Sequence, residues 1–198
     1  MTVRRGDAWG EAVTGAVDAA VVSNDADLAD AVAGSDRPVV IRGGDMHRSL
    51  GSPAGEAVTR RLPIDVIALV VDGRPRTAVA HVIARRHGRL GWWRGPIVAV
   101  MNVDHVGAWD AAPRAHPNDG WLDVIEVSES MSLRARWQAW RRLPTGSHLP
   151  HPDITVRRVR TETFTFGRPL SVWIDGIARG PIRSLRVDVE PDGAVLYV

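Results

Sequence analysis

The sequence predicts an α+β fold in which a short N-terminal α/β part precedes a mainly antiparallel β-sandwich. Before Pro63, the pattern of strand, turn and helix occurs twice in succession. After Pro63, short apolar stretches recur, and turns such as Asp72-Gly73 and Asp175-Gly176 separate most of them, as in a sandwich of short strands. We therefore expect two parts, residues 1–55 and residues 56–198.

The N-terminal part should contain two strands and two helices. Residues 19–22 form a short apolar strand, and Asn24 or Asp25 can cap a helix that ends at Gly34. A second buried strand, over residues 38–41, then leads into a short helix.

The strands of the sandwich are rich in branched apolar residues, and Gly, Pro or Asp turns bound most of them. We expect them at residues 64–71, 76–84, 96–103, 121–127, 154–161, 170–174, 182–189 and 194–198. One helix, over residues 132–143, interrupts the strands and should end there because Pro144 and Gly146 follow.

Composition excludes several classes of protein. The chain has 198 residues, no Cys, and 25 basic residues that are all Arg, so disulfides, Cys-ligated zinc and lysine chemistry are ruled out within it. The formal net charge of +2 gives no reason to expect a nucleic-acid partner. No apolar run approaches the ~20 residues of a membrane span, so we expect a cytoplasmic protein.

The most specific motif lies at residues 112–124, which read A-P-R-A-H-P-N-D-G-W-L-D-V. It resembles the A-P-x-A-x-x-x-D-G-x-L-D-V signature of bacterial diacylglycerol kinases and their sphingosine kinase relatives, in the NAD kinase/diacylglycerol kinase-like superfamily. The resemblance implies a β-rich C-terminal domain, ATP-dependent phosphorylation of a lipid hydroxyl and a structural divalent cation. It begins late in the family's pattern, so residues 1–55 would be a degenerate remnant of the nucleotide-binding domain.

Two turns correspond to the family's nucleotide-binding loops. Residues 41–51, I-R-G-G-D-M-H-R-S-L-G, match G-T-G-N-D-F-A-R-S-L-G, whereas residues 23–28 stand where the family has G-G-D-G-T-L. The resemblance thus implies that the nucleotide or phosphate would be bound by Asp25, Arg42, Gly43, Gly44 and Asp45.

The loop at residues 23–28 lacks the glycines that let backbone N–H groups approach a phosphate. Asp25, Asp27 and Asp30 stand near the expected triphosphate instead. Like charges about 4 Å apart repel by ~1 kcal/mol in water and ~4 kcal/mol at an effective dielectric of 20. We therefore expect these carboxylates to oppose ATP, although Arg42 could still bind a different phosphorylated ligand.

The expected catalytic base is also missing. Asp175-Gly176 matches the family's D-G-E motif, but Ile177 stands where the resemblance places the glutamate that deprotonates the lipid hydroxyl. Asp175 and Asp104 are the remaining candidates, although carboxylates in turns usually bond to their own backbone. The catalytic residue is therefore unassigned, with Asp175 as the candidate.

The resemblance places a structural Mg²⁺ site in the segment 112–124. The Asp119 carboxylate would bind the ion together with backbone carbonyls around His116 and Trp121, since hard oxygen ligands suit such a cation. The alternative is that residues 117–120 form an ordinary type I turn.

The histidines do not predict a zinc site. His148 and His151 are separated by a proline, and we expect them in a surface loop. His81 should be a core histidine, whereas His105, beside Asp104, is the better candidate for a ligand contact.

The helix at residues 132–143 allows two interpretations. Leu133, Trp137 and Trp140 fall on one stripe, which Arg134 and Arg141 flank. This stripe either lies on an anionic membrane, as a peripheral contact, or packs on the sandwich.

Three functions agree with these observations. The first is a lipid-kinase-like protein with impaired catalysis that binds a lipid or a phosphorylated small molecule. The second is an active ATP-dependent lipid phosphotransferase that a partner chain completes. The third is a homodimeric interaction protein in which sheet edges and tryptophan patches pair. The fold alone does not decide among the three.

Overall fold

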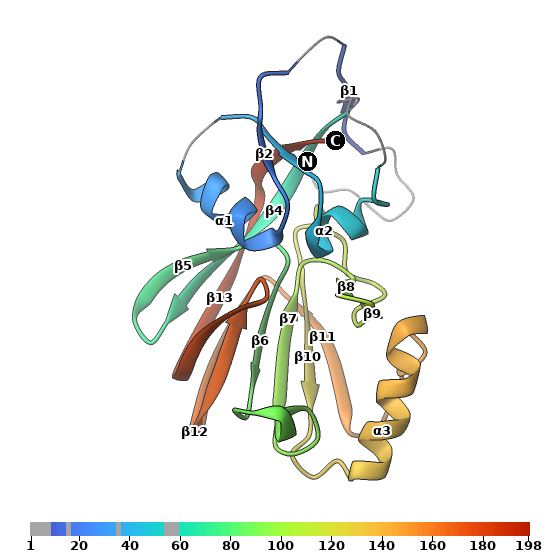
Figure 1. The fold of residues 1–198 in the computed structure, drawn as a ribbon. Helices are drawn as coiled ribbons and strands as arrows, with labels where there is room; N and C mark the ends of the chain where they lie inside the picture. Colours follow the sequence, from blue (N-terminus) through green and yellow to red (C-terminus); the bar gives the residue numbers. More distant parts are fainter. Residues whose placement is uncertain (1–8, 15–16, 35–36, 54–59) are drawn as a thin grey trace.

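The computed structural model describes residues 9–14, 17–34, 37–53 and 60–198. It confirms the α+β fold, with mixed elements at one end and antiparallel strands through the rest (Figure 1). The expected boundary between residues 55 and 56 lies outside the described residues. The division into residues 1–55 and 56–198 therefore stays a prediction.

The N-terminal elements follow the predicted order after one strand, β1, that was not predicted. They are β1 (Glu11–Ala12), β2 (Ala20–Val22), α1 (Asp25–Gly34), β3 (Val39–Ile41) and α2 (Gly44–Ser49). β2 and β3 pair in parallel, as two strands joined by a helix do.

The remaining elements are mainly antiparallel strands with short connections. They are β4 (Arg60–Val71), β5 (Arg74–Ala78), β6 (His81–Arg85), η1 (Arg89–Trp92), β7 (Ile97–Met101), β8 (His105–Val106), β9 (Trp109–Asp110), β10 (Leu122–Val127), α3 (Leu133–Arg142), η2 (Leu143–Thr145), β11 (Ile154–Val159), β12 (Thr161–Ile174) and β13 (Ile177–Tyr197). The Ser132 hydroxyl caps α3 by accepting the N–H of Ala135.

Some strand boundaries were predicted wrongly. The stretch 76–84 is two strands, β5 and β6, because the chain bends between them. Residues 182–189 and 194–198 belong largely to one strand, β13, in which an irregularity after Glu190 takes up the Pro-Asp-Gly residues. β12 likewise begins well before residue 170. The residues Pro-Asp-Gly, which predicted a turn, thus form an irregularity within the continuous pairing of β13 with β4.

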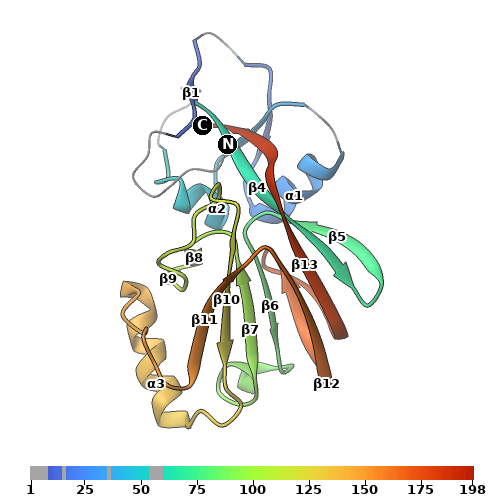
Figure 2. The same ribbon diagram turned by 180° about the vertical axis from the view of Figure 1, so that it is seen from behind.

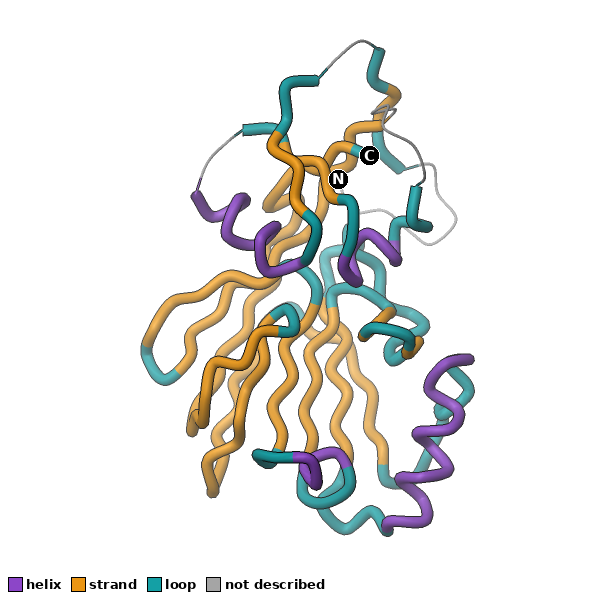
Figure 3. The backbone as a smooth tube through the Cα atoms, in the orientation of Figure 1, coloured by secondary structure: helices purple, strands orange, loops and turns teal. Residues whose placement is uncertain are grey.

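Eleven of the strands form one sheet that folds back on itself, and β8 and β9 form a separate two-stranded sheet. The main path of the large sheet is β1-β4-β13-β12-β6-β7-β10-β11, and β2, β3 and β5 pair beside it. The segment β4-β13-β12 lies against the segment β6-β7-β10-β11, which gives the two layers seen from both sides in Figures 1 and 2. β4 and β13 continue beyond the sandwich, and there Leu196 pairs in parallel with Val39 of β3. Figure 3 shows these strands reaching the helices at the N-terminal end.

Two apolar cores hold this arrangement together. The core between the two layers includes Ile67, Val100, Val124, Val172 and Leu185. The core under α1 and α2 includes Leu28, Met46, Ile64, Val103 and Leu196. Because β4 and β13 contribute side chains to both cores, the N-terminal helices pack on the same strands that build the sandwich.

Within the layer β6-β7-β10-β11, the strand β7 is apolar on both faces. Val98 and Val100 face the core between the layers, whereas Ile97 and Ala99 line the opposite face, which α3 covers. Strands that are buried on both faces carry nearly continuous apolar runs, and β7 reads I-V-A-V-M. None of the helices in the described part of the chain is long and apolar enough to span a membrane.

Candidate functional site

The turn that begins α1 is joined directly to the turn that begins α2. Asn24 caps α1, because its side-chain oxygen accepts the N–H of Asp27 at 2.9 Å. Asp25 points instead toward α2, where its carboxylate accepts the N–H groups of Asp45 at 2.7 Å and Met46 at 2.9 Å. Asp25 is buried, and burial raises its pKa although these hydrogen bonds lower it in part. The protein's own carboxylate thus takes the first backbone donors of α2.

The two glycines before Asp45 permit this close approach. A side chain at Gly44, where φ is +87°, would lie 2.5 Å from Oδ1 of Asp25. A side chain at Gly43 would overlap the backbone oxygen of Ser23. Arg42 lies just before them and donates its N–H to Val22 at 2.9 Å. The structure therefore brings Asp25, Arg42, Gly43, Gly44 and Asp45 together, and the glycines fit a contact between two turns.

A buried histidine continues this polar network into the sandwich. Nε2 of His81 lies 3.0 Å from Oδ2 of Asp45, and Oδ1 of Asp45 accepts the N–H of Gly107 at 2.8 Å. Burial lowers the pKa of His81, but the hydrogen bond to Asp45 and the charges of Asp175, Asp45 and Asp25 raise it above its ordinary value overall. His81 is thus a core histidine with a carboxylate partner, as the sequence predicted for its burial.

The candidate catalytic residue Asp175 lies at the tight turn between β12 and β13. Its carboxylate accepts three N–H groups, from Val79, Ala80 and His81, each at 2.9 Å. Burial raises the pKa of Asp175 to about 6, although these bonds oppose the shift. The carboxylate therefore fixes the bend that separates β5 from β6. Two residues on, Ile177 is exposed and offers only hydrocarbon.

A second acidic residue with a histidine lies against the other end of α2. The Ser49 hydroxyl donates to Oδ1 of Asp104, and Nδ1 of His105 lies 2.7 Å from the same oxygen. Asp104 and His105 are partly exposed. Since Asp45 and Ser49 are one turn apart on α2, this short helix links the Asp45–His81 pair to the Asp104–His105 pair.

The expected magnesium loop is held by protein contacts. Oδ1 of Asp119 accepts the N–H of Trp121 at 3.1 Å, and Arg158 donates to Oδ2 of Asp119. Nδ1 of His116 accepts the N–H of Asn118 at 3.2 Å. Arg158 therefore occupies Oδ2 of Asp119, whereas Oδ1 accepts one N–H group, and the magnesium site stays a prediction.

Two other carboxylates surround this loop. Asp65 accepts the N–H groups of Gly120 at 2.6 Å and Asp192 at 3.1 Å, while Oδ2 of Asp123 has no hydrogen-bond partner within the described ranges. Burial raises the pKa of both Asp65 and Asp123 to about 6. Even so, the described residues contain no group of three His, Asp or Glu side chains placed to hold a metal.

A cavity of about 230 Å³ lies between α3 and the outer face of the layer β6-β7-β10-β11. Its lining is almost entirely apolar. The sheet contributes Ile83, Ile97, Ala99, Ile125 and Val127. The covering elements contribute Trp92, Trp93, Trp109, Met131, Ala139, Trp140 and Leu143. This cavity was not predicted from the sequence.

Two buried polar side chains, Arg136 and His148, also line the cavity. The guanidinium of Arg136 donates to four backbone oxygens, those of Met131, Trp92, Gly95 and Ser128, at 2.6–3.2 Å. It therefore ties the loop around η1 to the start of α3. Backbone oxygens thus accept the hydrogen bonds of Arg136 without any ligand.

The prediction that His148 lies in a surface loop was wrong. The side chain is buried because its loop packs on the residues around β9: at Gly146, where φ is +63°, a Cβ would lie 2.6 Å from the Asp110 carboxylate. Burial lowers the pKa of His148, although a hydrogen bond with the backbone of Ala111 and the charge of Asp110 raise it in part. Its Nδ1 has no hydrogen-bond partner within the described part of the chain.

The sequence held a signal for this cavity. The stretch that became β7, I-V-A-V-M, lacks the polar residues that alternate along a strand with one solvated face. Such strands need a cover on the outer face, and the only long helix downstream carries tryptophans.

Comparisons with known proteins agree with this fold. The sequence model of the family described as the YegS C-terminal NAD kinase beta sandwich-like domain matches residues 64–197. Among curated proteins, none matches the sequence. One solved structure, a diacylglycerol kinase from Bacillus anthracis str. Sterne, matches with a TM-score of 0.62 and 16% identity, over 91% of this chain and 76% of that one. A candidate diacylglycerol kinase from the same organism matches with a TM-score of 0.68 and 13% identity, over 91% and 78%.

Proposed function

This chain belongs to the YegS C-terminal NAD kinase beta sandwich-like family, and from that premise we propose that it binds a lipid chain in the cavity beneath α3 and does not transfer phosphate. The observation that carries the proposal is the predominantly apolar lining of this cavity, in which Arg136 and His148 are the buried polar side chains. Three further observations support it, in this order. They are the size of the cavity, the chemistry of His148, and the contacts made by the turns before α1 and α2.

The size of the cavity favours part of one acyl chain. Sites for drug-sized ligands span about 300–1,000 Å³, and this cavity measures about 230 Å³. Each buried methylene contributes ~0.8 kcal/mol, so a segment of several methylenes supports micromolar binding after the costs of association. A charged headgroup has no counterpart inside, because Arg136 is already bonded to four carbonyls.

His148 gives the site a preference among lipids. Its lowered pKa leaves the ring neutral near pH 7, and a buried nitrogen without a partner costs free energy unless a ligand supplies one. A lipid with a hydroxyl or an ester beside its chain would supply that partner, whereas a plain hydrocarbon would not.

The turns at α1 and α2 support the absence of phosphotransfer. Asp25 already accepts the backbone donors at the start of α2, so a phosphate would have to replace a carboxylate that the fold buries. Asp175 is bonded to three backbone N–H groups, and Ile177 has no proton acceptor. The alternative, an active phosphotransferase completed by a partner chain, would have to use another base, such as the partly exposed Asp104–His105 pair.

Fluorescence tests lipid binding directly, because four tryptophans line the cavity. Dioctanoylglycerol and a brominated fatty acid are titrated into the wild-type protein and into Ala139→Phe, which fills the cavity from α3. We expect saturable quenching by the brominated acid, and a Kd at least about tenfold higher in Ala139→Phe, which corresponds to ~1.4 kcal/mol.

The matched control is Ala108→Phe, since Ala108 is exposed in the turn between β8 and β9 and does not line the cavity. Quenching that is equal in all three proteins, or a loss that Ala108→Phe shares, would refute the proposed site.

Transfer of labelled phosphate from ATP to dioctanoylglycerol tests the second half of the proposal. We expect no product from the wild type, and none from Ile177→Glu, because Asp25 still occupies the donors of α2. Product formation by pure wild-type protein would show that the chain is an active lipid kinase.

A further inference from the structure

We propose that the end of the molecule formed by the loop around η1 and by α3 docks on an anionic lipid bilayer. This proposal goes beyond lipid binding and does not depend on what occupies the cavity. It stands on exposed apolar side chains, on a one-sided distribution of charge, and on the position of the cavity next to both.

Exposed apolar side chains gather at this end. Leu90 is 64% exposed, Leu133 50% and Trp137 47%, although they belong to segments far apart in the sequence. All three line one surface groove together with Trp93. Single exposed apolar residues are common on soluble proteins, but a group of them marks an interaction surface.

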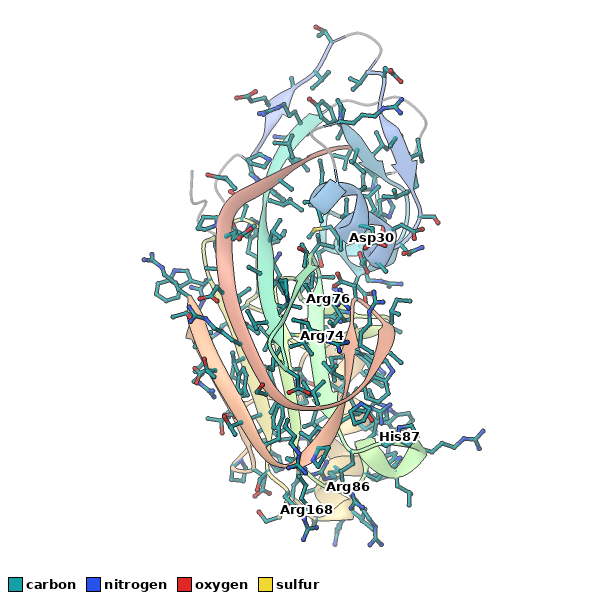
Figure 4. The ribbon with its side chains drawn as sticks, turned by 90° about the vertical axis from the view of Figure 1, so that its left-hand side faces the viewer. Asp30, Arg74, Arg76, Arg86, His87 and Arg168 are labelled. Carbon is teal, nitrogen blue, oxygen red and sulfur yellow. The ribbon has the colours of Figure 1, made fainter. Side chains whose placement is uncertain are left out.

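The charge around the groove has one sign. Residues 86–95 and 132–143 contain no Asp or Glu. The arginines exposed there are Arg86, Arg89, Arg94, Arg134, Arg141 and Arg142. Figure 4 shows Arg86 and His87 near Arg168, at the end opposite Asp30 of α1. With a net charge of only +2 for the whole chain, this end is far more basic than the average surface.

Apolar and basic groups are arranged as an interfacial contact requires. Trp137 carries the guanidinium of Arg141 over its ring at 4.9 Å, so one position offers an indole to the acyl boundary and a cation to phosphates. Each basic residue near an anionic membrane surface contributes about 1 kcal/mol. Burial lowers the pKa of Arg136 overall, although the charges of Asp153 and Glu129 raise it in part.

The groove adjoins the apolar cavity. Trp93 lines both, and its ring lies 6.1 Å from that of Trp140, which is a further lining residue of the cavity. Docking by the groove would therefore bring the cavity close to the lipid surface.

A second copy of the chain fits this surface less well than a bilayer does. A symmetric contact through the groove would place the arginines of one copy against those of the other, and like charges at contact distance repel. An anionic bilayer instead offers phosphates to the arginines and an acyl boundary to Leu90, Leu133 and Trp137.

Vesicle co-sedimentation tests the proposal. The protein is mixed with vesicles of phosphatidylcholine alone or with added phosphatidylglycerol, at low and high salt. We expect binding that requires phosphatidylglycerol, weakens with salt because screening shortens the reach of the charges, and falls at least about tenfold in Leu90→Glu/Trp137→Glu. The control Val21→Glu/Ile177→Glu changes two exposed apolar residues outside the groove and should bind like the wild type.

The arginines are tested separately. Arg86→Gln/Arg94→Gln/Arg134→Gln should lose most of the dependence on phosphatidylglycerol, while Arg74→Gln/Arg76→Gln/Arg179→Gln, with equal charge change elsewhere on the surface, should retain it. Far-UV circular dichroism verifies that each variant is folded.

Three results would overturn the proposal. They are equal binding to both kinds of vesicle, unchanged binding of the groove variants, and a dimer by light scattering that Leu90→Glu/Trp137→Glu dissociates. The last would make this face an interface between copies of the chain.

Discussion

Gly44 and Asp25 together determine what the turn before α2 can bind. In the family pattern such glycines expose backbone donors, but here Gly44 makes room for a carboxylate from the neighbouring turn. A motif that matches in sequence thus serves a contact inside the protein. The residue responsible is Asp25, which lies in the turn before α1 and bonds to the backbone of α2.

Gly44→Ala should destabilise the protein by about 2–4 kcal/mol. The left-handed backbone costs ~1–2 kcal/mol with a Cβ, and displacing Asp25 weakens charge-assisted hydrogen bonds worth ~1.5–3 kcal/mol each. Urea denaturation gives the free energy of unfolding. Gly51→Ala is the control, because Gly51 has φ of +85° with nothing within 4 Å of the added Cβ. Equal losses in the two variants would contradict the contact with Asp25.

The Asp45–His81 pair should make stability depend on pH. The pKa of His81 in the folded protein lies above its ordinary value of 6.5, so the folded state binds the proton more tightly. The stabilisation is complete below pH 6.5 and is lost as the pH rises through the raised value. The melting temperature of the wild type should therefore fall over this range, and Asp45→Asn should flatten the curve.

Asp27→Asn is the control for that measurement, because Asp27 is exposed and bonded to Asn24 rather than to His81. Curves of equal slope in wild type and Asp45→Asn would show that the pair does not titrate as a unit.

The sequence predicted site residues that lie in motifs. It predicted less well the site residues whose position depends on contacts with distant parts of the chain. The turns at residues 23–28 and 41–51 were found, and the structure brings them together. No local pattern shows that Asp25 would bond to α2 rather than to its own helix. His148 was misassigned because the burial of its loop depends on packing against β9, which lies far upstream.

At the scale of elements, Arg136 connects α3 to the η1 loop and to the turn before the helix. The sequence shows the stripe of Leu133, Trp137 and Trp140, but the structure leaves all three substantially exposed. The buried residue of α3 is a charged one, since Arg136 bonds to backbone oxygens from the η1 loop and from the turn before the helix.

Arg136→Met should lower the free energy of unfolding by about 2–4 kcal/mol. It leaves several buried carbonyls without donors, at ~1–3 kcal/mol each, and relief from burying a charge offsets part of the loss. Chemical denaturation followed by tryptophan fluorescence measures the change. Arg134→Met alters an exposed arginine of the same helix and should stay within ~0.5 kcal/mol. If Arg136→Met left the free energy of unfolding unchanged, the η1 loop would have to be held by its tryptophans instead.

In the strands, pairing with distant partners overrides local turn residues. Residues 191–193, Pro-Asp-Gly, are a strong turn signal, yet β13 runs through them because β4 pairs with it on both sides of the irregularity. Alternation and turn chemistry therefore predicted most strands, while their lengths depended on partners distant in the chain.

At the scale of the whole molecule, β4 and β13 connect the two cores, so we expect both cores to unfold as one cooperative unit. The sequence separates an α/β part from a sandwich, because the order of elements changes near Pro63. In space the same two strands extend through both, and Leu196 lies buried among residues of α1 and α2.

Leu196→Ala should therefore destabilise the entire chain by about 2–5 kcal/mol, the range for a buried leucine. Circular dichroism and tryptophan fluorescence should report one coincident transition, as a single cooperative unit requires. Val156→Ala, on a strand of the sandwich where Val156 is 40% exposed, should change little. Two separated transitions would show that the helices unfold independently of the sandwich.

The parallel pairing of β3 with the end of β13 has a consequence for synthesis on the ribosome. β3 (Val39–Ile41) is synthesised long before residues 196 and 197, which complete its ladder. Until translation reaches these residues, Val39, Val40 and the apolar side of α1 lack the contacts that bury them in the folded protein. The nascent chain should therefore expose apolar surface during the interval between the two strands, and a holding chaperone would protect it during that time.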